Sequence, residues 1–283
     1  MAATSRAGRP RSKRVLPGFT LSLGVTLFYL GVIVLLPLLA LALKAGGIGW
    51  EQFVRVVASE RAIATYRVTL GAAALATLFN AFYGLLMAWV LVRYDFPGKR
   101  LLDALVDLPF ALPTAVAGLA LSALFAGNGW FGQYLEPLGI KVAYTPLGIA
   151  VAMAFTSAPF VIRTVQPVLE DLETDVEQAA ETLGARPWQI FAKVVFPAIF
   201  PAFLAGCALA FARAIGEFGA IIYIAGNKPF QSEITALLVF IRLDEYDYPA
   251  AASIASVVLL AAFSLMLTTN LIQAWQRRYA RIA

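Results

Sequence analysis

Long apolar runs alternate with short polar intervals along most of the chain. A helix of about 20 apolar residues is long enough to cross roughly 30 Å of hydrocarbon. No internal repeat and no second soluble domain are evident, so one helical membrane unit is expected over 16–283, after a basic tail at 1–15. The pattern predicts an all-α integral membrane protein with six transmembrane helices, at about 19–43, 68–92, 101–125, 145–162, 198–225 and 250–272.

The first apolar run also has features of a cleaved signal peptide, because Ala40-Leu41-Ala42 resembles a cleavage site. The run is, however, roughly twice as long as the ~7–15 apolar residues of a signal peptide. We therefore expect an uncleaved transmembrane helix at 19–43.

The basic residues predict the orientation of the helices. Cytoplasmic flanks of membrane helices carry an excess of Lys and Arg. Such residues gather in the tail, after the second run, around 163–193 and beyond the last run. Both termini and the 163–193 region are therefore expected in the cytoplasm. The interval 45–67 is an exception, since it holds several cations although the alternation places it outside.

Two predicted elements are irregular. Pro109 and Pro113 lie inside the third run, together with Asp103 and Asp107. Prolines remove backbone donors, so this helix should be broken, with its free carbonyls facing protein or water. The two carboxylates are expected at headgroup level, and a proton relay is the alternative. The interval 226–249 contains an apolar patch too short to span, which we interpret as a membrane-surface helix on the outer face.

The segment 174–197 is polar but has the pattern of a helix. Thr174 precedes Glu177 by three residues, a spacing that predicts a capping box at the start of a helix. Apolar residues then recur with helical period and should form one face that another surface covers. These residues are Val176, Ala179, Ala180 and Leu183.

A sharp turn and a second helix should follow. Gly184 comes after the last apolar position, where a positive φ can close a helix without a steric clash. Pro187 suits the first turn of a new helix, which is expected to end at Pro197. By pattern alone this hairpin could simply pack on its own protein, since helical hairpins are common.

The run QAAETLGA, followed by Val194, Phe196 and Pro197, resembles the EAA motif of binding-protein-dependent ABC importer permeases. The stretch LPFALPTAVAGLAL is similar to the same family. This resemblance implies a MetI-like type-1 importer bundle, in which the hairpin is a coupling helix that docks on a separate ATPase subunit. Gln178 replaces the usual Glu of the motif and loses its charge. The residues expected to couple to the ATPase are Glu177, Gln178, Ala179, Ala180, Leu183, Gly184 and Ala185.

Three longer pieces, RAIGEFGAIIYIAGN, SEITALLVFIRLDEYDYPAAASIAS and AAETLGARPWQ, resemble T-type permease subunits of bacterial sulfate/thiosulfate importers. The resemblance implies an inner-membrane protein that passes the anion from a periplasmic sulfate/thiosulfate-binding protein into the cytoplasm. It also implies a second homologous permease and two ATPase subunits. ATP and Mg would bind to the ATPase, with no cofactor in this chain. Molybdate or tungstate is the alternative substrate.

Arg213 and Glu217 lie inside the fifth run, where ionisable side chains are costly unless they are paired or hydrated. One interpretation is a neutral structural pair at i and i+4. The other is that Arg213 lines the passage for an oxyanion, because its guanidinium carries several donors and is always charged. Both interpretations can hold together.

Composition narrows the function classes further. The chain is 60% hydrophobic and 14% charged, with a mean hydropathy of +0.78, as expected for a protein within a bilayer. It has no His and one Cys, Cys207, which we interpret as a packing residue, so disulfides and Cys/His metal sites are excluded. The net charge of +5 follows topology and does not indicate nucleic-acid binding.

The chain also lacks a phosphate-binding G-x-x-x-x-G-K-[ST] loop, so the chain itself is not expected to be an enzyme. An ion-coupled secondary anion transporter remains the alternative of a different class, with Asp103, Asp107 and Glu217 as its candidate carboxylates.

Overall fold

The computed structural model describes residues 19–279, and the side chains of residues 19–272. The described residues are helical and contain no strand. Two π-helical turns, Gly31–Leu35 and Phe191–Val195, join successive helices into longer rods. The α-helices are α1 Phe19–Leu30, α2 Leu36–Gly46, α3 Trp50–Val57, α4 Glu60–Arg93, α5 Lys99–Val106, α6 Leu108–Ala111, α7 Thr114–Phe125, α8 Gly132–Leu135, α9 Pro146–Glu170, α10 Thr174–Thr182, α11 Pro187–Ile190, α12 Phe196–Ile215, α13 Ile221–Ile224, α14 Thr235–Asp244 and α15 Tyr248–Tyr279.

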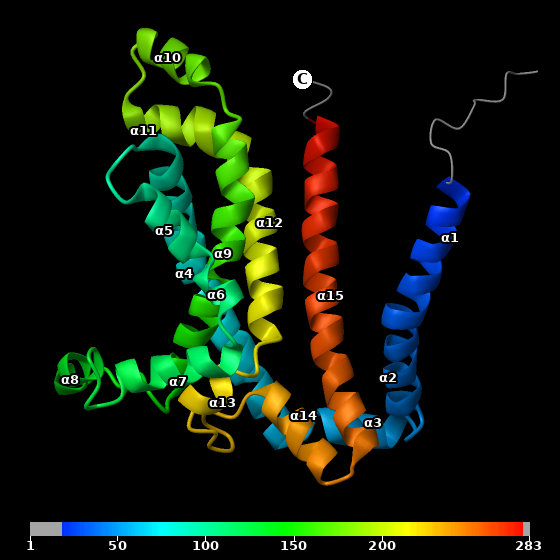
Figure 1. Cartoon of the computed structure of the whole chain (residues 1–283). Helices are drawn as coiled ribbons and strands as arrows, with labels where there is room; N and C mark the ends of the chain where they lie inside the picture. The colour runs from blue at the N-terminus through cyan, green and yellow to red at the C-terminus, as the bar shows by residue number, and fades with distance from the viewer. Residues whose placement is uncertain (1–18, 280–283) are drawn as a thin grey trace, which may run out of the picture.

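Five helices of the described residues are long and apolar enough to cross a membrane. They correspond to the first, second, fourth, fifth and sixth predicted spans, with several of their ends shifted by a few residues or more. Both described ends of the chain and α10 lie at the same end of the molecule, at the top of Figure 1. The basic tail 1–15 and Arg281 lie outside the described residues. The five rods are Phe19–Gly46, Glu60–Arg93, Pro146–Glu170, Pro187–Ile215 and Tyr248–Ile272.

The third predicted span, 101–125, is broken into α5, α6 and α7, so a count of six continuous spans is not confirmed. The break follows the prolines, as expected. Pro109 occupies the first turn of α6, and Leu112, just before Pro113, is extended at φ −80° and ψ 132°. A residue before proline is pushed out of the helical region by the proline ring. After the break, α7 runs sideways away from the bundle (Figure 1).

The core of the bundle is the contact among α4, α9 and α12. Small residues on α4 make this contact close, because alanine and glycine let helix backbones approach. Ala73, Ala76 and Ala88 are fully buried, and a Cβ at Gly84 would lie 2.8 Å from Val161 on α9. Cys207 is half-buried on α12 within the same packing, which agrees with a packing role.

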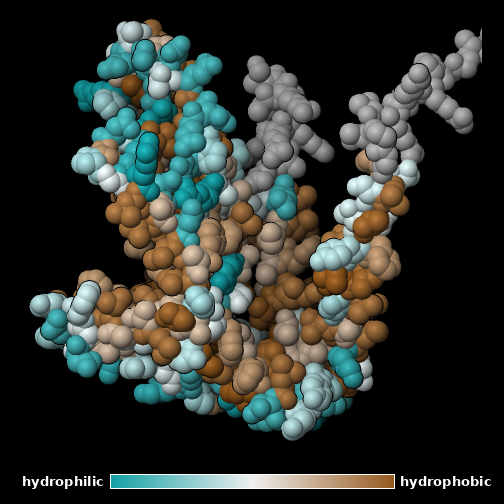
Figure 2. All heavy atoms as spheres, viewed as in Figure 1, coloured by the Kyte–Doolittle hydropathy of each residue, from teal (hydrophilic) through white to brown (hydrophobic). Residues whose placement is uncertain are grey.

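The rod formed by α1 and α2 stands apart from this core (Figure 1). The described residues of α1 include no buried side chain, and α2 buries only Ala45. Within the chain, α2 contacts α15 and α3. Figure 2 shows the rod as a mostly hydrophobic column, which is the surface expected of a helix surrounded by lipid.

The end of the bundle opposite α10 is fixed by polar contacts. Arg61 on α4 makes a two-point ion pair with Glu233, through Nε at 2.9 Å and Nη2 at 2.6 Å. Nearby, the Thr69 hydroxyl accepts from the backbone N–H of Thr235 at 2.9 Å. These contacts hold the loop before α14 against the start of α4.

Two polar intervals of the sequence lie at this end. The interval 45–67 forms a short amphipathic helix, α3, and the start of α4. The patch in 226–249 forms α14, but this helix is not purely a surface helix. Leu237 and Leu238 are buried, since α14 packs on α15 and α4. Burial of its apolar side within the protein replaces the expected contact with lipid.

The contact between α7 and α13 generates a stability prediction. Gly118 on α7 faces the backbone of Ala220, and a Cβ there would lie 2.3 Å from the Ala220 carbonyl oxygen. Gly118→Ala should therefore destabilise the protein by about 1–3 kcal/mol, because the backbone must move to make room. The measurement is thermal unfolding of the purified protein in detergent.

Gly71→Ala is the matched control. Gly71 also lies in a helix, but nothing lies within 4 Å of a Cβ at that position. Alanine there should be neutral or stabilising by about 0.5–1 kcal/mol, through helix propensity alone. Equal unfolding midpoints for the two variants would contradict the close contact.

Candidate functional site

The predicted hairpin lies at the tip of the molecule, beyond the end of α9 (Figure 1). α10 begins at Thr174, as the pattern indicated to within one residue. The expected capping box is wrong: the N-cap is Glu173, no side chain caps the helix, and Glu177 forms an ion pair with Arg93. The carboxylate thus makes its charge-assisted hydrogen bond to a partner on α4 and not to the start of its own helix.

Gly184 closes α10 as predicted. Its φ is +82°, in the left-handed region that glycine adopts without steric cost. The N–H of Ala185 donates to the Ala180 carbonyl at 3.1 Å, and the N–H of Gly184 donates to the Glu181 carbonyl at 2.8 Å. This pair of bonds is the Schellman motif, which satisfies carbonyls at the end of a helix.

The second helix starts at Pro187, as predicted, and the N–H of Arg186 donates to Gln189 Oε1 at 2.8 Å. The prediction that this second helix ends at Pro197 is wrong. The π turn Phe191–Val195 precedes Pro197, so the proline enters the first turn of α12 and the rod continues to Ile215. A π turn shifts the hydrogen-bond register and so accommodates a residue without an N–H.

Two contacts, linked through Arg93 and Trp89 on α4, join the hairpin to the bundle. Arg93, at the end of α4, pairs with Glu177 on α10. The guanidinium of Arg93 also lies 5.8 Å from the centre of the Trp89 ring. Trp89 in turn packs edge-on against Phe191, with ring centres 5.4 Å apart. The hairpin is therefore attached to α4 by charge and aromatic contacts as well as to α9 by the chain.

The apolar side of the hairpin is open. Leu183 is 88% exposed, Trp188 73% and Val176 49%. Figure 2 shows that the surrounding tip is mostly hydrophilic. The expected docking residues all lie on α10 or in its closing turn, and only Glu177, Ala180 and Ala185 among them are partly covered. Large apolar side chains exposed on a polar tip are typical of surfaces that bind another protein.

Arg213 and Glu217 are paired, with Nη1 and Oε2 2.6 Å apart. The two residues do not share one helix, because α12 ends at Ile215. Glu217 is 2% exposed, and its Oε1 accepts from the N–H of Ala220 at 2.9 Å. The structure thus agrees with the neutral-pair interpretation, while Arg213 keeps part of its surface accessible.

A second charged cluster was not predicted as a unit. Asp103 and Asp107 both pair with Arg163 on α9, at 2.6 Å and 2.7 Å. The two carboxylates are expected at headgroup level, and Arg163 lies at the start of the basic region 163–193. The spacing of the two carboxylates by four residues was a signal that they share one face, but nothing in the sequence specified their partner.

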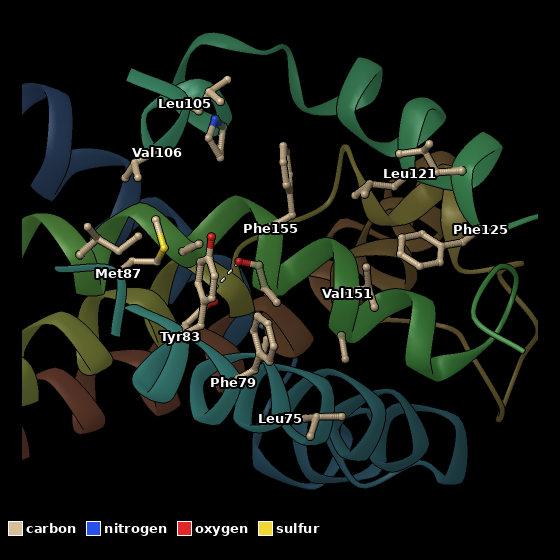
Figure 3. A pocket seen from close by; sticks show the side chains of 18 of the residues that line it. Leu75, Phe79, Tyr83, Met87, Leu105, Val106, Leu121, Phe125, Val151 and Phe155 are labelled. Carbon is tan, nitrogen blue, oxygen red and sulfur yellow. Dashed lines mark hydrogen bonds between the residues drawn. The ribbon is translucent and has the colours of Figure 1, made fainter. Parts of the chain in front are cut away.

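A cavity of about 710 Å³ separates the arm α5–α7 from α4 and α9. In Figure 3, Leu105, Leu121 and Phe125 line one side of it, and Phe79 and Phe155 the other. This lining offers an oxyanion no positive charge. The cavity is therefore suited to apolar groups.

Comparison with known proteins identifies the family to which the chain belongs. Residues 80–281 match the family described as "Binding-protein-dependent transport system inner membrane component". The chain belongs to this family. It is thus a multi-pass membrane component of an ABC-type transport system, and the likeness of its segment 174–197 to the EAA motif is explained.

Relatives and solved structures agree with this membership. The chain is 57% identical over 263 residues to the sulfate transport system permease protein CysT of Escherichia coli (strain K12), covering 93% of this chain and 95% of that protein. It is 50% identical over 256 residues to the protein of the same name from Synechocystis sp., covering 90% of each. A bacterial ABC transporter that imports alginate has the same fold, with a TM-score of 0.74, 17% identity, and coverage of 91% of this chain and 96% of that one.

The turn at Gly184 generates a local prediction. Gly184→Val should cost about 1–2 kcal/mol, because a side chain with a branched Cβ is disfavoured at positive φ. Nothing lies within 4 Å of a Cβ at Gly184, so the effect comes from the backbone alone. Hydrogen exchange of α10 in the purified protein should become faster in this variant.

Gly184→Asn is the control, because asparagine tolerates the left-handed region better than other residues with side chains. Its exchange rates should stay near those of the parent. If both variants exchange alike, the positive φ is not what closes α10.

Proposed function

We propose that the chain is the membrane-spanning permease subunit of an ATP-driven importer that passes sulfate or thiosulfate from a periplasmic binding protein into the cytoplasm. The observation that carries this proposal is the open apolar face of α10, on a chain 57% identical to the E. coli sulfate permease over 93% of its length. The protein would lie in the bacterial inner membrane, with α10 and both termini in the cytoplasm.

Two features of the chain indicate its partners: the sequence has no phosphate-binding loop, and the hairpin exposes apolar side chains. Its sequence has no phosphate-binding loop, so ATP and Mg would bind to two separate ATPase subunits. The exposed Leu183 and Trp188 supply an apolar surface for docking one of them. A second, homologous permease would complete the passage. Movement of the docked hairpins would then swing the attached helices between inward-open and outward-open states.

The passage should bind the anion weakly. Tight binding of a divalent oxyanion needs several converging donors. Arg213 is already paired with Glu217, and the large cavity is apolar. Selectivity would therefore come from the external binding protein, which can form a dedicated site.

Ion-coupled transport is less well supported by the structure. A coupling carboxylate has to bind and release a proton or a sodium ion during transport. Asp103, Asp107 and Glu217 are each held in an ion pair in the described structure. A carboxylate whose oxygens already bind an arginine is not free to bind a coupling ion.

The substrate and the energy source can be tested together. The assembled complex in proteoliposomes should take up labelled sulfate only when ATP and the binding protein are supplied. Uptake driven by an ion gradient without ATP would contradict the proposal. Thiosulfate, molybdate and tungstate as competitors would define the substrate range, and strong inhibition by molybdate alone would reassign it.

Docking can be tested at Leu183. Leu183→Asp should weaken binding of the ATPase subunit by about 2 kcal/mol or more, roughly 30-fold in Kd, because it puts a charge into an apolar contact. The measurement is copurification and titration of the ATPase with the permease pair. Leu138→Asp is the control, since Leu138 is similarly exposed but lies in the 3-10 turn Glu136–Leu138, away from the hairpin. Equal weakening by both substitutions would show that α10 is not the docking element.

A further inference from the structure

The guanidinium of Arg163 uses all of its N–H groups. Nε and Nη2 donate to the two carboxylate oxygens of Asp107, at 2.9 Å and 2.7 Å. Nη1 donates to Asp103 Oδ1 at 2.6 Å and to Gln166 Oε1 at 2.7 Å. The second N–H of Nη2 donates to the Asp103 carbonyl at 2.8 Å. A planar guanidinium held on both edges has a fixed position and a fixed orientation.

This cluster joins the arm α5–α7 to α9 by charged contacts. Arg163 lies on α9, close to the end that leads into α10. Asp103 lies on α5, and Asp107 lies between α5 and α6. The arm also touches α9 through Phe110 on α6, which packs edge-on against Phe160 with ring centres 5.3 Å apart, and the apolar cavity lies beside these contacts (Figure 3). The main packing of α9 is against α4 and α12.

The far end of the same arm touches the loop that holds the buried charge pair. Gly118 on α7 packs directly on the backbone of Ala220. The Ser122 hydroxyl donates to the Tyr223 carbonyl on α13 at 3.0 Å. The N–H of Ala220 itself donates to Glu217. A displacement of α7 therefore has to displace the loop around Glu217, because no free space separates them.

We propose that Arg163 is a positioning residue that makes the arm α5–α7 move together with α9 and α10, so that movement of the docking hairpin reaches the loop of Glu217. The inference rests on the proposed function, since it assumes that α10 is moved by an ATPase. It assigns to Asp103 and Asp107 a mechanical role in place of a proton relay. A bidentate pair suits this role, because it resists rotation as well as separation.

The first test compares transport with hydrolysis in the whole complex in proteoliposomes. Arg163→Lys keeps the charge but cannot reproduce the planar fork, and Asp107→Asn keeps the shape but removes the charge. In both variants, the amount of sulfate imported per ATP hydrolysed should fall by about fivefold or more, the lower range of typical coupling between sites. Hydrolysis itself should persist.

Arg55→Lys is the matched control, because Arg55 makes an exposed pair with Glu51 within α3, at the end of the bundle opposite α10. Its ratio of import to hydrolysis should equal that of the parent. A purely structural role of Arg163 would lower the yield of complex, and with it import and hydrolysis in proportion, leaving the ratio unchanged. An unchanged ratio in Asp107→Asn would overturn the inference, even if Arg163→Lys fails to assemble.

The second test needs no transported substrate. Spin labels are placed at Leu119 on α7 and at Asp171 just after α9, both exposed, in a Cys207→Ser background. In the parent complex, the distance between the labels should be the same with and without bound ATP, because the two parts move together. In Asp107→Asn the distance distribution should broaden or shift with ATP. A distribution as narrow as that of the parent would overturn the inference.

The two tests separate the inference from the function on which it rests. A parent complex that hydrolyses ATP but never imports sulfate contradicts the proposed substrate, while the label distances still decide the role of Arg163. A parent that imports sulfate, with variants that match it in both tests, contradicts the role of Arg163 alone.

Discussion

The position of α9 between α4 and α12 is the constraint on which the rest of the structure depends. In lipid, little hydrophobic force drives helices together, so close packing and hydrogen bonds between helices must do so. Alanines and Gly84 on α4 give the close packing, and Asn80 donates across it to the Ala154 carbonyl at 3.0 Å and to Ser157 Oγ at 2.9 Å. α9 is thus held rigidly against α4 and α12, and the hairpin follows directly from its end.

The charged residues of the bundle join parts of the chain that are far apart in sequence. Arg61 with Glu233 fixes the end of the bundle opposite α10, Arg163 with its two aspartates fixes the broken arm to α9, and Arg93 with Glu177 fixes the hairpin to α4. Ion pairs that are partly removed from water define geometry more than they add stability. The structure therefore combines an apolar core with a few polar contacts that set the relation between its parts.

The sequence predicted the helical fold and the hairpin because both leave local signals. Apolar length predicts a span, Pro109 and Pro113 predict a break, and Gly184 with Pro187 predicts a turn between helices. The predicted capping box at Thr174 is wrong because Glu177 pairs with Arg93, which lies 84 positions earlier in the chain. Arg163 was not predicted as the centre of a charged cluster for the same reason, since pairing between distant segments leaves no periodic pattern in the sequence. The predicted helix end at Pro197 is wrong because the amino-acid composition does not reveal the π turn that lets the helix continue.

The residues of the α1–α2 rod are constrained by different surroundings from those of α4. Its described side chains contact little protein within the chain, so the membrane constrains its length and its hydrophobicity more than the shape of each residue. α4 must instead keep small residues at particular positions, because Ala73, Ala76 and Gly84 face other helices. The two helices should therefore diverge at different rates among relatives, with free exchange of Leu, Ile, Val and Phe in the rod and retention of alanine and glycine in α4.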